Sequence, residues 1–345
     1  MSPTVILIIL SSLATGTIIT MTSHHWLFAW IGLEMNTLAI IPTIATLHNP
    51  RSTEAATKYF LTQAAASAMI LFSSMINAWQ IGTWDITNLS STPSHILLTL
   101  ALAMKLGLAP MHFWLPEVLQ GTTLFTALIV STWQKLAPLA LIYLTVTNLS
   151  TTVLVILGLL STIVGGWGGL NQTQTRKIMA YSSIAHLGWM FSIAAILINI
   201  MILNLIIYLI MTMALFCFLI SAQSKTIQDT MTIWTLSPAM TSTMMILLLS
   251  LGGLPPLTGF MPKWLILDGL IIQNLTPVAI IMAMATLLSL FFYLRLTYTT
   301  ALTLSPNMLQ TKFKWRLKPN MMSSLMMTSS SLSIFFLPML PFIFL

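Results

Sequence analysis

Two stretches decide how this chain folds: MKLGLAPMHFWLPEV at residues 104–118 and GGLPPLTGFMPKW at residues 252–264. Both contain Gly-Leu-x-Pro, then five residues, then Pro and a charged side chain, and the copies start 146 positions apart, at Gly107 and Gly253. Proline inside an apolar helix removes a backbone donor and kinks or breaks the helix. The repeat therefore predicts two broken helices at matching places in two halves, a pattern that indicates a transport site in membrane proteins. The alternative is two ordinary proline kinks that share a spacing.

The composition is that of a membrane protein. Of 345 residues, 57% are hydrophobic and only 6% are charged, and the mean hydropathy is +0.93. A soluble domain would need many more charged residues on its surface. Apolar runs of roughly 20 residues, the length of a membrane span, follow one another from end to end. We therefore predict an all-α polytopic membrane protein without a soluble domain, in which the N-terminal run is a span and not a cleaved signal peptide.

The apolar runs predict about 11 transmembrane helices with approximate boundaries. We place them near residues 2–22, 25–47, 53–79, 95–119, 122–145, 149–170, 174–195, 198–221, 239–272, 276–302 and 322–343. The two predicted breaks are five spans apart, an odd number, so the halves that contain them would be inverted in the membrane. The chain is thus expected to be a single transmembrane domain, 1–345, with approximate inverted halves 1–146 and 147–303 and a C-terminal helix at 322–343.

Basic residues gather in the even-numbered connectors between these spans, and so on one face of the membrane. The residues concerned are Arg51, Lys58, Arg176, Lys177, Lys225, Lys312, Lys314, Arg316 and Lys318. By the positive-inside rule, this face and the N-terminus are cytosol-like or matrix-like, and the C-terminus lies on the opposite side. The formal net charge of +7 is therefore explained by topology and does not indicate binding to nucleic acid.

Four charged side chains lie within or beside the apolar runs: Glu34, Lys105, Lys135 and Lys263. Placing an ion in hydrocarbon costs at least about 2.5–3.5 kcal/mol. A chain with so few charges is expected to keep four of them at membrane depth only where they face one another or a wet path. The sequence therefore predicts a protein that handles charge inside a membrane.

Each of the four has a proposed role and a simpler alternative. A carboxyl such as Glu34, disfavoured in its charged form by burial and favoured by a nearby cation, can change its protonation readily. Lys105 is its expected partner, and the alternative is a static ion pair between two helices. Lys135 follows Ser131 and Thr132, whose hydroxyls could hold water beside it. Lys263 follows the second break, whose carbonyls would give it partners. For both of these lysines the alternative is snorkelling to an interface.

Three further residues are secondary candidates. His112 and His186 could relay protons near neutral pH, and the alternative for each is a hydrogen-bonded histidine within the packing. Glu117 ends a span and could line an exit or simply face water. Glu54 and Lys58, four residues apart, are expected to form a rim ion pair.

Several chemistries are not supported by the sequence. It contains no P-loop and no Rossmann glycine pattern. The single cysteine, Cys217, cannot ligate an iron–sulfur cluster or form a disulfide within the chain. We therefore expect no cofactor, metal or redox centre in this chain.

Four segments closely resemble one known family: NPRSTEAATKYFLTQA (49–64), GGLNQTQTRKIMAYSSIAHLGWM (168–190) and the two stretches that contain the repeat. The family is mitochondrial NADH–ubiquinone oxidoreductase chain 2, an antiporter-like subunit in the membrane arm of respiratory complex I. The resemblance runs the length of the chain. It implies two inverted five-helix repeats with broken helices, and it implies that Glu34, Lys105, Lys135 and Lys263 form a line of polar groups that moves protons.

The resemblance also implies a setting. Quinone reduction would be performed by other subunits, which would hold NADH, FMN, the iron–sulfur clusters and ubiquinone. The partners would be neighbouring antiporter-like, small core and accessory subunits, together with membrane lipids such as cardiolipin. The location would be the mitochondrial inner membrane, with the N-terminus on the matrix side and the C-terminus on the intermembrane-space side. Two alternatives stay open: a free-standing cation/proton antiporter, and a scaffold whose charged residues only lock helices together.

Overall fold

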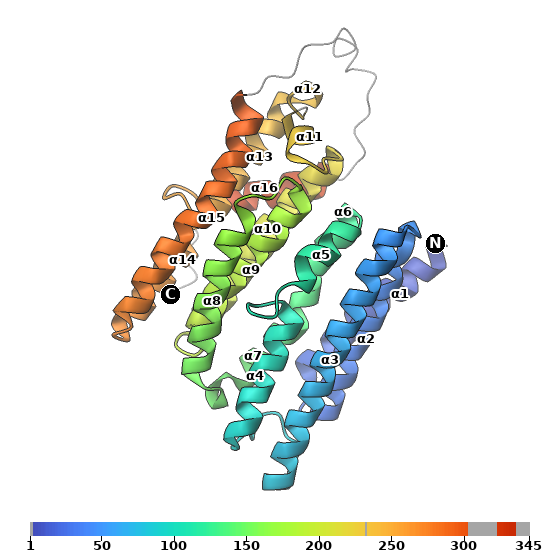
Figure 1. Cartoon of the computed structure of the whole chain (residues 1–345), viewed down its shortest axis with the longest axis vertical. Coiled ribbons are helices and arrows are strands. Elements are labelled where there is room, and N and C mark those ends of the chain that lie inside the picture. Colours follow the sequence, from blue (N-terminus) through green and yellow to red (C-terminus); the bar gives the residue numbers. More distant parts are fainter. Residues whose placement is uncertain (1–2, 232, 303–322, 336–345) are drawn as a thin grey trace. The chain divides into compact units, whose positions relative to one another are not determined.

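The computed structural model describes residues 3–231, 233–302 and 323–335, and this part of the chain is helical apart from turns and two isolated β-bridges (Figure 1). The basic residues Lys312, Lys314, Arg316 and Lys318 and the last part of the predicted span 322–343 lie outside the described residues. Contacts divide the chain into a first unit, residues 1–161 and 191–198, and a second unit, residues 162–190 and 199–345.

The first unit begins with long helices and continues with short ones. Its elements are α1 (Pro3–Thr22), α2 (Trp26–Ile44), α3 (Pro50–Ile81), α4 (Thr92–Leu106), α5 (Trp114–Gly121), α6 (Leu124–Ser131), α7 (Leu136–Thr145) and the start of α8 (Thr151–Gly169). Helices α1 and α2 pack closely because glycines meet at their contact: a Cβ atom on Gly16 would lie 2.9 Å from the Gly32 carbonyl oxygen. Helix α3 packs against α2, α4 and α5, so it links the broken helix to the N-terminal helices.

The second unit contains the end of α8, most of α9 (Thr175–Ala194) and α10 (Ile198–Ser221), and then α11 to α16. These last helices are α11 (Ile227–Met231), α12 (Ile233–Leu236), α13 (Pro238–Gly252), α14 (Phe260–Ile272), α15 (Thr276–Leu302) and α16 (Ser323–Phe335). Helix α13 packs against α15 and α16. At the start of α11, the backbone N–H groups of Thr226 and Lys225 donate to the Asp229 carboxylate at 2.8 and 2.9 Å and lower the pKa of Asp229.

Within the described residues, seven helical segments are long and apolar enough to cross a membrane. They are Pro3–Thr22, Trp26–Leu47, Pro50–Ile81, Leu124–Asn148, Thr151–Gly169, Ile198–Ser221 and Thr276–Ala301. The predicted runs 95–119 and 239–272 are each divided into two short helices, α4 with α5 and α13 with α14. The all-α class and the two broken helices are thus confirmed, while the count of about 11 spans and the inverted halves stay predictions.

Candidate functional site

The first broken helix turns at a glycine. Helix α4 ends at Leu106, and Gly107 follows with a left-handed backbone (φ 80°). Glycine adopts this conformation without steric cost. The N–H of Gly107 donates to the Ala103 carbonyl at 2.9 Å, and Pro110 follows shortly after. Because proline cannot donate a backbone hydrogen bond, the helix does not resume before α5.

Side chains from elsewhere donate to two of the last carbonyls of α4. Trp114 Nε1 on α5 donates to the Met104 carbonyl at 3.1 Å, and Gln63 Nε2 on α3 donates to the Lys105 carbonyl at 3.3 Å. A buried carbonyl without a partner would cost about 1–3 kcal/mol. The Trp114 indole and the Gln63 amide therefore stabilise the end of α4 beside Lys105, whose ammonium group is buried.

The second broken helix repeats this backbone geometry but has a different cap. Gly253 has φ 81°, and its N–H donates to the Ser250 carbonyl at 2.9 Å. Here a lysine takes the remaining carbonyls: Lys263 Nζ lies 2.9 Å from the Gly252 oxygen and 3.4 Å from the Leu251 oxygen. The carbonyls of the second break are thus partners of Lys263, as the sequence predicted. Its side chain is buried, with 8% exposed, which argues against snorkelling.

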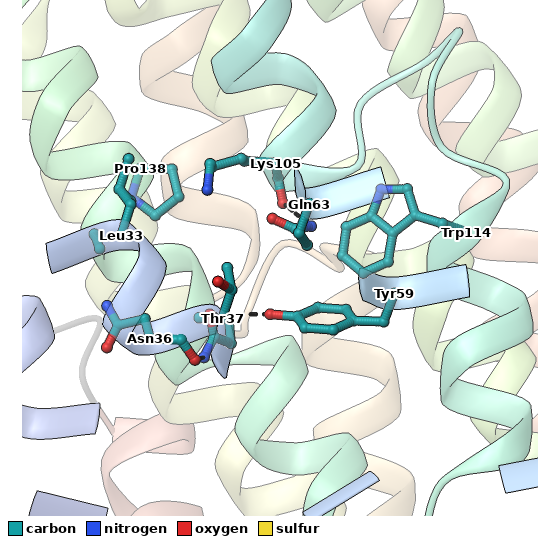
Figure 2. A pocket seen from close by; sticks show the side chains of 10 residues that line it. Leu33, Asn36, Thr37, Tyr59, Gln63, Lys105, Trp114 and Pro138 are labelled. Atoms are coloured by element: carbon teal, nitrogen blue, oxygen red, sulfur yellow. Dashed lines mark hydrogen bonds between the residues drawn. The ribbon is translucent and has the colours of Figure 1, made fainter. Parts of the chain in front are cut away.

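A small cavity lies beside Lys105 in the first unit (Figure 2). The centre of a water molecule can move within about 10 Å³ of it, close to the smallest volume that holds one water. Its lining residues come from α2 to α5 and from around α7: Leu33, Asn36, Thr37, Tyr59, Gln63, Lys105, Trp114, Gln134, Ala137 and Pro138. Lys105 is 5% exposed, and its Nζ has no hydrogen-bond partner among the described residues.

Glu34 lies on α2, one turn before the cavity-lining Thr37. The Thr37 hydroxyl lies 2.9 Å from Glu34 Oε2, to which it donates. The Glu34 carboxylate acts electrostatically on both Lys105 and Tyr59. Both ion pairs in the described part of the chain belong to Lys58, so Glu34 and Lys105 interact across a gap and not in direct contact.

Lys135 occupies an interruption that the sequence analysis did not predict. The expected span 122–145 consists of α6, a 3-10 segment at Trp133–Lys135, and α7. Pro138 explains the interruption because it cannot donate to the carbonyl four residues earlier. Lys135 is 3% exposed. The hydroxyls of Ser131 and Thr132 both donate to the Leu128 carbonyl, at 3.0 and 2.7 Å, which ties them to their own helix.

The two histidines lie apart from the cavity lining. His112 is in the turn between α4 and α5, with Nδ1 3.3 Å from the Pro110 carbonyl oxygen and its ring 4.3 Å from that of Phe113. In a continuous helix, His112 would lie two turns after Lys105 on the same face. The break between α4 and α5 prevents this arrangement. His186 is buried in α9, and its ring centroid lies 5.4 Å from that of Tyr208. Neither lines the cavity, and their relay roles stay predictions.

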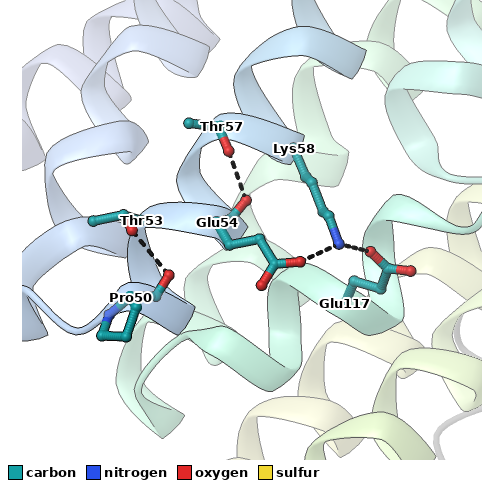
Figure 3. Close-up of polar contacts among 6 residues, drawn as sticks. All are labelled: Pro50, Thr53, Glu54, Thr57, Lys58 and Glu117. Carbon is teal, nitrogen blue, oxygen red and sulfur yellow. Dashed lines mark hydrogen bonds and ion pairs between the residues drawn. The ribbon is translucent and has the colours of Figure 1, made fainter.

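Glu117 belongs to an exposed cluster of three charges (Figure 3). Lys58 Nζ lies 2.5 Å from an oxygen of Glu54 and 2.5 Å from an oxygen of Glu117, so the predicted Glu54–Lys58 pair is confirmed. The side chains are 40–59% exposed, and ion pairs between exposed side chains contribute little to stability. The cluster joins α3 to α5 at the surface of this chain. None of its three residues lines the cavity, whose one charged lining residue is Lys105.

Sequence reasoning missed the polar residues that surround Lys105. Tyr59 and Gln63 lie one turn apart on α3, and the Tyr59 hydroxyl lies 3.5 Å from Gln134 Oε1. Gln134 Nε2 in turn donates to the Asn36 carbonyl at 3.2 Å. These residues could have been found from the sequence, because they are polar side chains inside long apolar runs, as the four charged residues are.

Comparison with known proteins identifies the family. The family model for the membrane part of NADH:quinone oxidoreductases and Mrp antiporters matches residues 23–291, which include both breaks, and the model for the NADH dehydrogenase subunit 2 C-terminus matches residues 290–344. NADH-ubiquinone oxidoreductase chain 2 of Varanus timorensis is 55% identical over 341 residues, which are 99% of each chain. This chain belongs to the NADH–ubiquinone oxidoreductase chain 2 family. The chain 2 protein of Squalus acanthias, 54% identical over 344 residues, agrees with this; those residues are 100% of this chain and 99% of that protein.

Solved structures share the fold of this chain 2 family member. A chain of respiratory complex I from Thermus thermophilus matches with a TM-score of 0.82 and 25% identity, over 96% of this chain and 78% of that chain. A chain of the Mrp complex from Dietzia matches with a TM-score of 0.77 at 17% identity, over 86% of this chain and 60% of that chain. The second match concerns the fold alone.

The indole cap at the first break leads to a prediction. We expect Trp114→Phe to speed hydrogen exchange of the Gly107 and Leu108 amides. The Met104 carbonyl loses the indole donor and keeps only the Gly107 N–H at 3.2 Å, so the end of α4 opens more often. A loss of about 1.4 kcal/mol corresponds to about tenfold faster exchange. Exchange measured by mass spectrometry on the intact assembly checks it. Trp167→Phe, at a 71% exposed side chain, is the control, and equal exchange in both variants would show that the indole does not stabilise the break.

Proposed function

We propose that this chain moves protons through the membrane by a relay of Glu34, Lys105, Lys135 and Lys263. Its family makes it a proton-translocating membrane subunit of complex I. The single observation that carries the relay is the environment of Lys105: a buried ammonium group that has no hydrogen-bond partner among the described residues, lies beside a cavity and is under the field of Glu34. A purely structural lysine would be expected to have its hydrogens satisfied by carbonyls or a carboxylate.

The charge on Glu34 is the control element in this proposal. A carboxylate near Lys105 stabilises the protonated lysine, and its neutralisation or displacement favours release of the proton from Lys105. Electron transfer elsewhere in the complex would act on Glu34, and the change in charge at Lys105 would then alter the proton affinity of Lys135 and, in turn, of Lys263. The interaction without direct contact supports this role, because a tight ion pair would resist separation.

Lys263 has geometry suited to proton transfer at the second break. An ammonium group has three hydrogens, and two carbonyls, those of Leu251 and Gly252, accept from it. One hydrogen is left over for transfer. A neutral amine would still have two hydrogens for the same two carbonyls, so loss of a proton does not require loss of the cap.

Membership of the family supports a proposal for the wider setting. We propose that NADH, FMN, the iron–sulfur clusters and ubiquinone are held by other subunits, and that this chain contacts other membrane-arm subunits. The location would be the mitochondrial inner membrane, with the N-terminus on the matrix side. The matched backbone of the two breaks supports inverted halves at 1–146 and 147–303. Agreement with chain 2 relatives over 99% of their length disfavours a free-standing antiporter.

Glu34→Gln tests the relay. We expect protons pumped per electron to fall and coupled turnover to slow at least about tenfold, since a neutral amide cannot stabilise or release the charge on Lys105. The measurement is acidification of vesicles that hold the intact complex, recorded together with NADH oxidation. Glu54→Gln, at an exposed carboxylate of the same unit, is the control. Full pumping with Glu34→Gln would remove this charge from the mechanism.

A further inference from the structure

The cavity beside Lys105 has the features of a hydration site. A buried polar group without a partner is costly, and more so when it is charged. Lys105 Nζ is such a group among the described residues, and its side chain lines a cavity with room for about one water molecule. Figure 2 shows the Lys105 side chain, Gln63, the Tyr59 hydroxyl and Thr37 arranged around this space. A water there would accept one of the ammonium hydrogens and so reduce this cost.

Thr37 connects this space to the carboxylate of Glu34. Its hydroxyl lies 2.9 Å from the Glu34 carbonyl oxygen and 2.9 Å from Glu34 Oε2. A bond to the carbonyl three residues earlier is ordinary for threonine in a helix, but the carboxylate contact is not part of that pattern. A hydroxyl that donates its hydrogen still has lone pairs that accept, so the Thr37 oxygen can accept from a water in the cavity.

The side chains of Tyr59, Gln63 and Gln134, which also line the cavity, already take part in hydrogen bonds between its walls. Tyr59 Oη pairs with Gln134, and Gln63 Nε2 donates to the Lys105 carbonyl. The amide of Asn36 has no hydrogen-bond partner among the described residues, and it lies against α1, since a Cβ atom on Gly16 would come 2.6 Å from Asn36 Oδ1. Of the lining residues, Thr37 is thus the one that the structure joins to Glu34.

We propose that one water molecule occupies this cavity between Lys105 Nζ and Thr37 Oγ1, and that the water and the Thr37 hydroxyl form the path for a proton between Lys105 and Glu34. This inference rests on the proposed relay and names its path. Thr37 is a residue that carries the proton through its hydroxyl and does not store it.

The transfer balances atom by atom. One N–H bond of the Lys105 ammonium breaks as the water oxygen gains that proton, and the water passes one of its own protons to Thr37 Oγ1. The original hydrogen of the Thr37 hydroxyl moves to Glu34 Oε2. The ammonium and carboxylate become an amine and a carboxylic acid, and water and Thr37 are regenerated. The return path reverses each step.

Three substitutions on α2 test the path. Thr37→Val keeps the shape of the side chain and removes the hydroxyl, and we expect coupled proton pumping by the intact complex to fall about tenfold. Thr37→Ser keeps the hydroxyl and should restore pumping, with a pH profile like that of the unmodified complex. Thr43→Val is the matched control, because the Thr43 hydroxyl donates to the Ile40 carbonyl at 2.7 Å and does not line the cavity.

Each outcome decides between alternatives. Loss of pumping with Thr37→Val, recovery with Thr37→Ser and normal pumping with Thr43→Val support the path. Normal pumping with Thr37→Val, or loss with both variants of Thr37, overturns it. If Glu34→Gln stops pumping while Thr37→Val does not, the relay stands and this path is wrong; if neither changes pumping, the relay itself fails. A map of the intact complex with ordered waters should show one density bonded to Lys105 and Thr37, and a cavity filled by a side chain would contradict the proposal.

Discussion

Lys105→Met is expected to stop proton pumping by this subunit while the complex still assembles. Methionine keeps an unbranched apolar stem of similar length and adapts to irregular surroundings. Because Lys105 Nζ has no hydrogen-bond partner among the described residues, its removal leaves no carbonyl there without a donor. The buried cation disappears, and with it the group that takes up and releases the proton. The rate of coupled turnover is expected to fall at least about 10²-fold, and it is measured as the rates of vesicle acidification and NADH oxidation, whose ratio gives the proton stoichiometry.

The choice of lysine matters for this experiment. Removal of Lys263 would also leave the Leu251 and Gly252 carbonyls without their donor, so a loss of pumping there would mix stability with mechanism. Lys225→Met is a suitable control, since Lys225 is exposed and lies in the connector before α11. Unchanged proton stoichiometry with Lys105→Met would show that this lysine does not take part in transfer.

The breaks could be predicted from the sequence because their causes are local. Glycine with left-handed φ and proline without an N–H act on the backbone at their own positions, and the matching φ values of Gly107 and Gly253 follow from a matching sequence. The buried charges could be predicted for a similar reason. An ion in an apolar run is costly wherever the run packs, so the sequence marks Lys105, Lys135 and Lys263 as candidates for burial, with snorkelling as the alternative for Lys135 and Lys263.

What caps each break could not be predicted, because it depends on tertiary contacts. Met104 accepts from an indole ten residues later, while the Lys105 carbonyl accepts from an amide on α3. At the second break, the Leu251 carbonyl, which corresponds to that of Lys105, accepts from Lys263 at 3.4 Å. Equal backbone patterns thus received different side-chain donors. The gap between Glu34 and Lys105 is likewise set by the packing of α2, α3 and α4 and not by spacing along the chain. The interruption that Lys135 occupies has a local cause, Pro138, and could have been predicted from the sequence.

Gly259→Ala is expected to have the largest effect on stability. Gly259 precedes α14, and a Cβ atom there would overlap the carbonyl oxygen of Ser250 near the end of α13. This carbonyl accepts from Gly253 at 2.9 Å, so it cannot move without loss of the turn that ends α13. Lys263 would then lose its register with the carbonyls that it caps. Overpacking of a buried site lowers the free energy of unfolding by about 1–3 kcal/mol, and by more where the backbone must shift. For Gly259→Ala we expect a loss of stability of about 3 kcal/mol.

The measurement is the amount of assembled complex and its thermal midpoint in mild detergent, with Gly252→Ala as the matched control. Gly252 is seven positions earlier at the same break, and a Cβ atom there would meet its nearest neighbour, Tyr293, at 3.8 Å, an ordinary contact. Alanine also favours a helix over glycine by about 1 kcal/mol, so this control is expected to assemble normally. If both variants assemble with equal stability, α13 and α14 do not meet at Ser250. If only Gly259→Ala fails to assemble or loses stability, the close approach of α13 and α14 is required for Lys263 on α14 to cap the carbonyls at the end of α13.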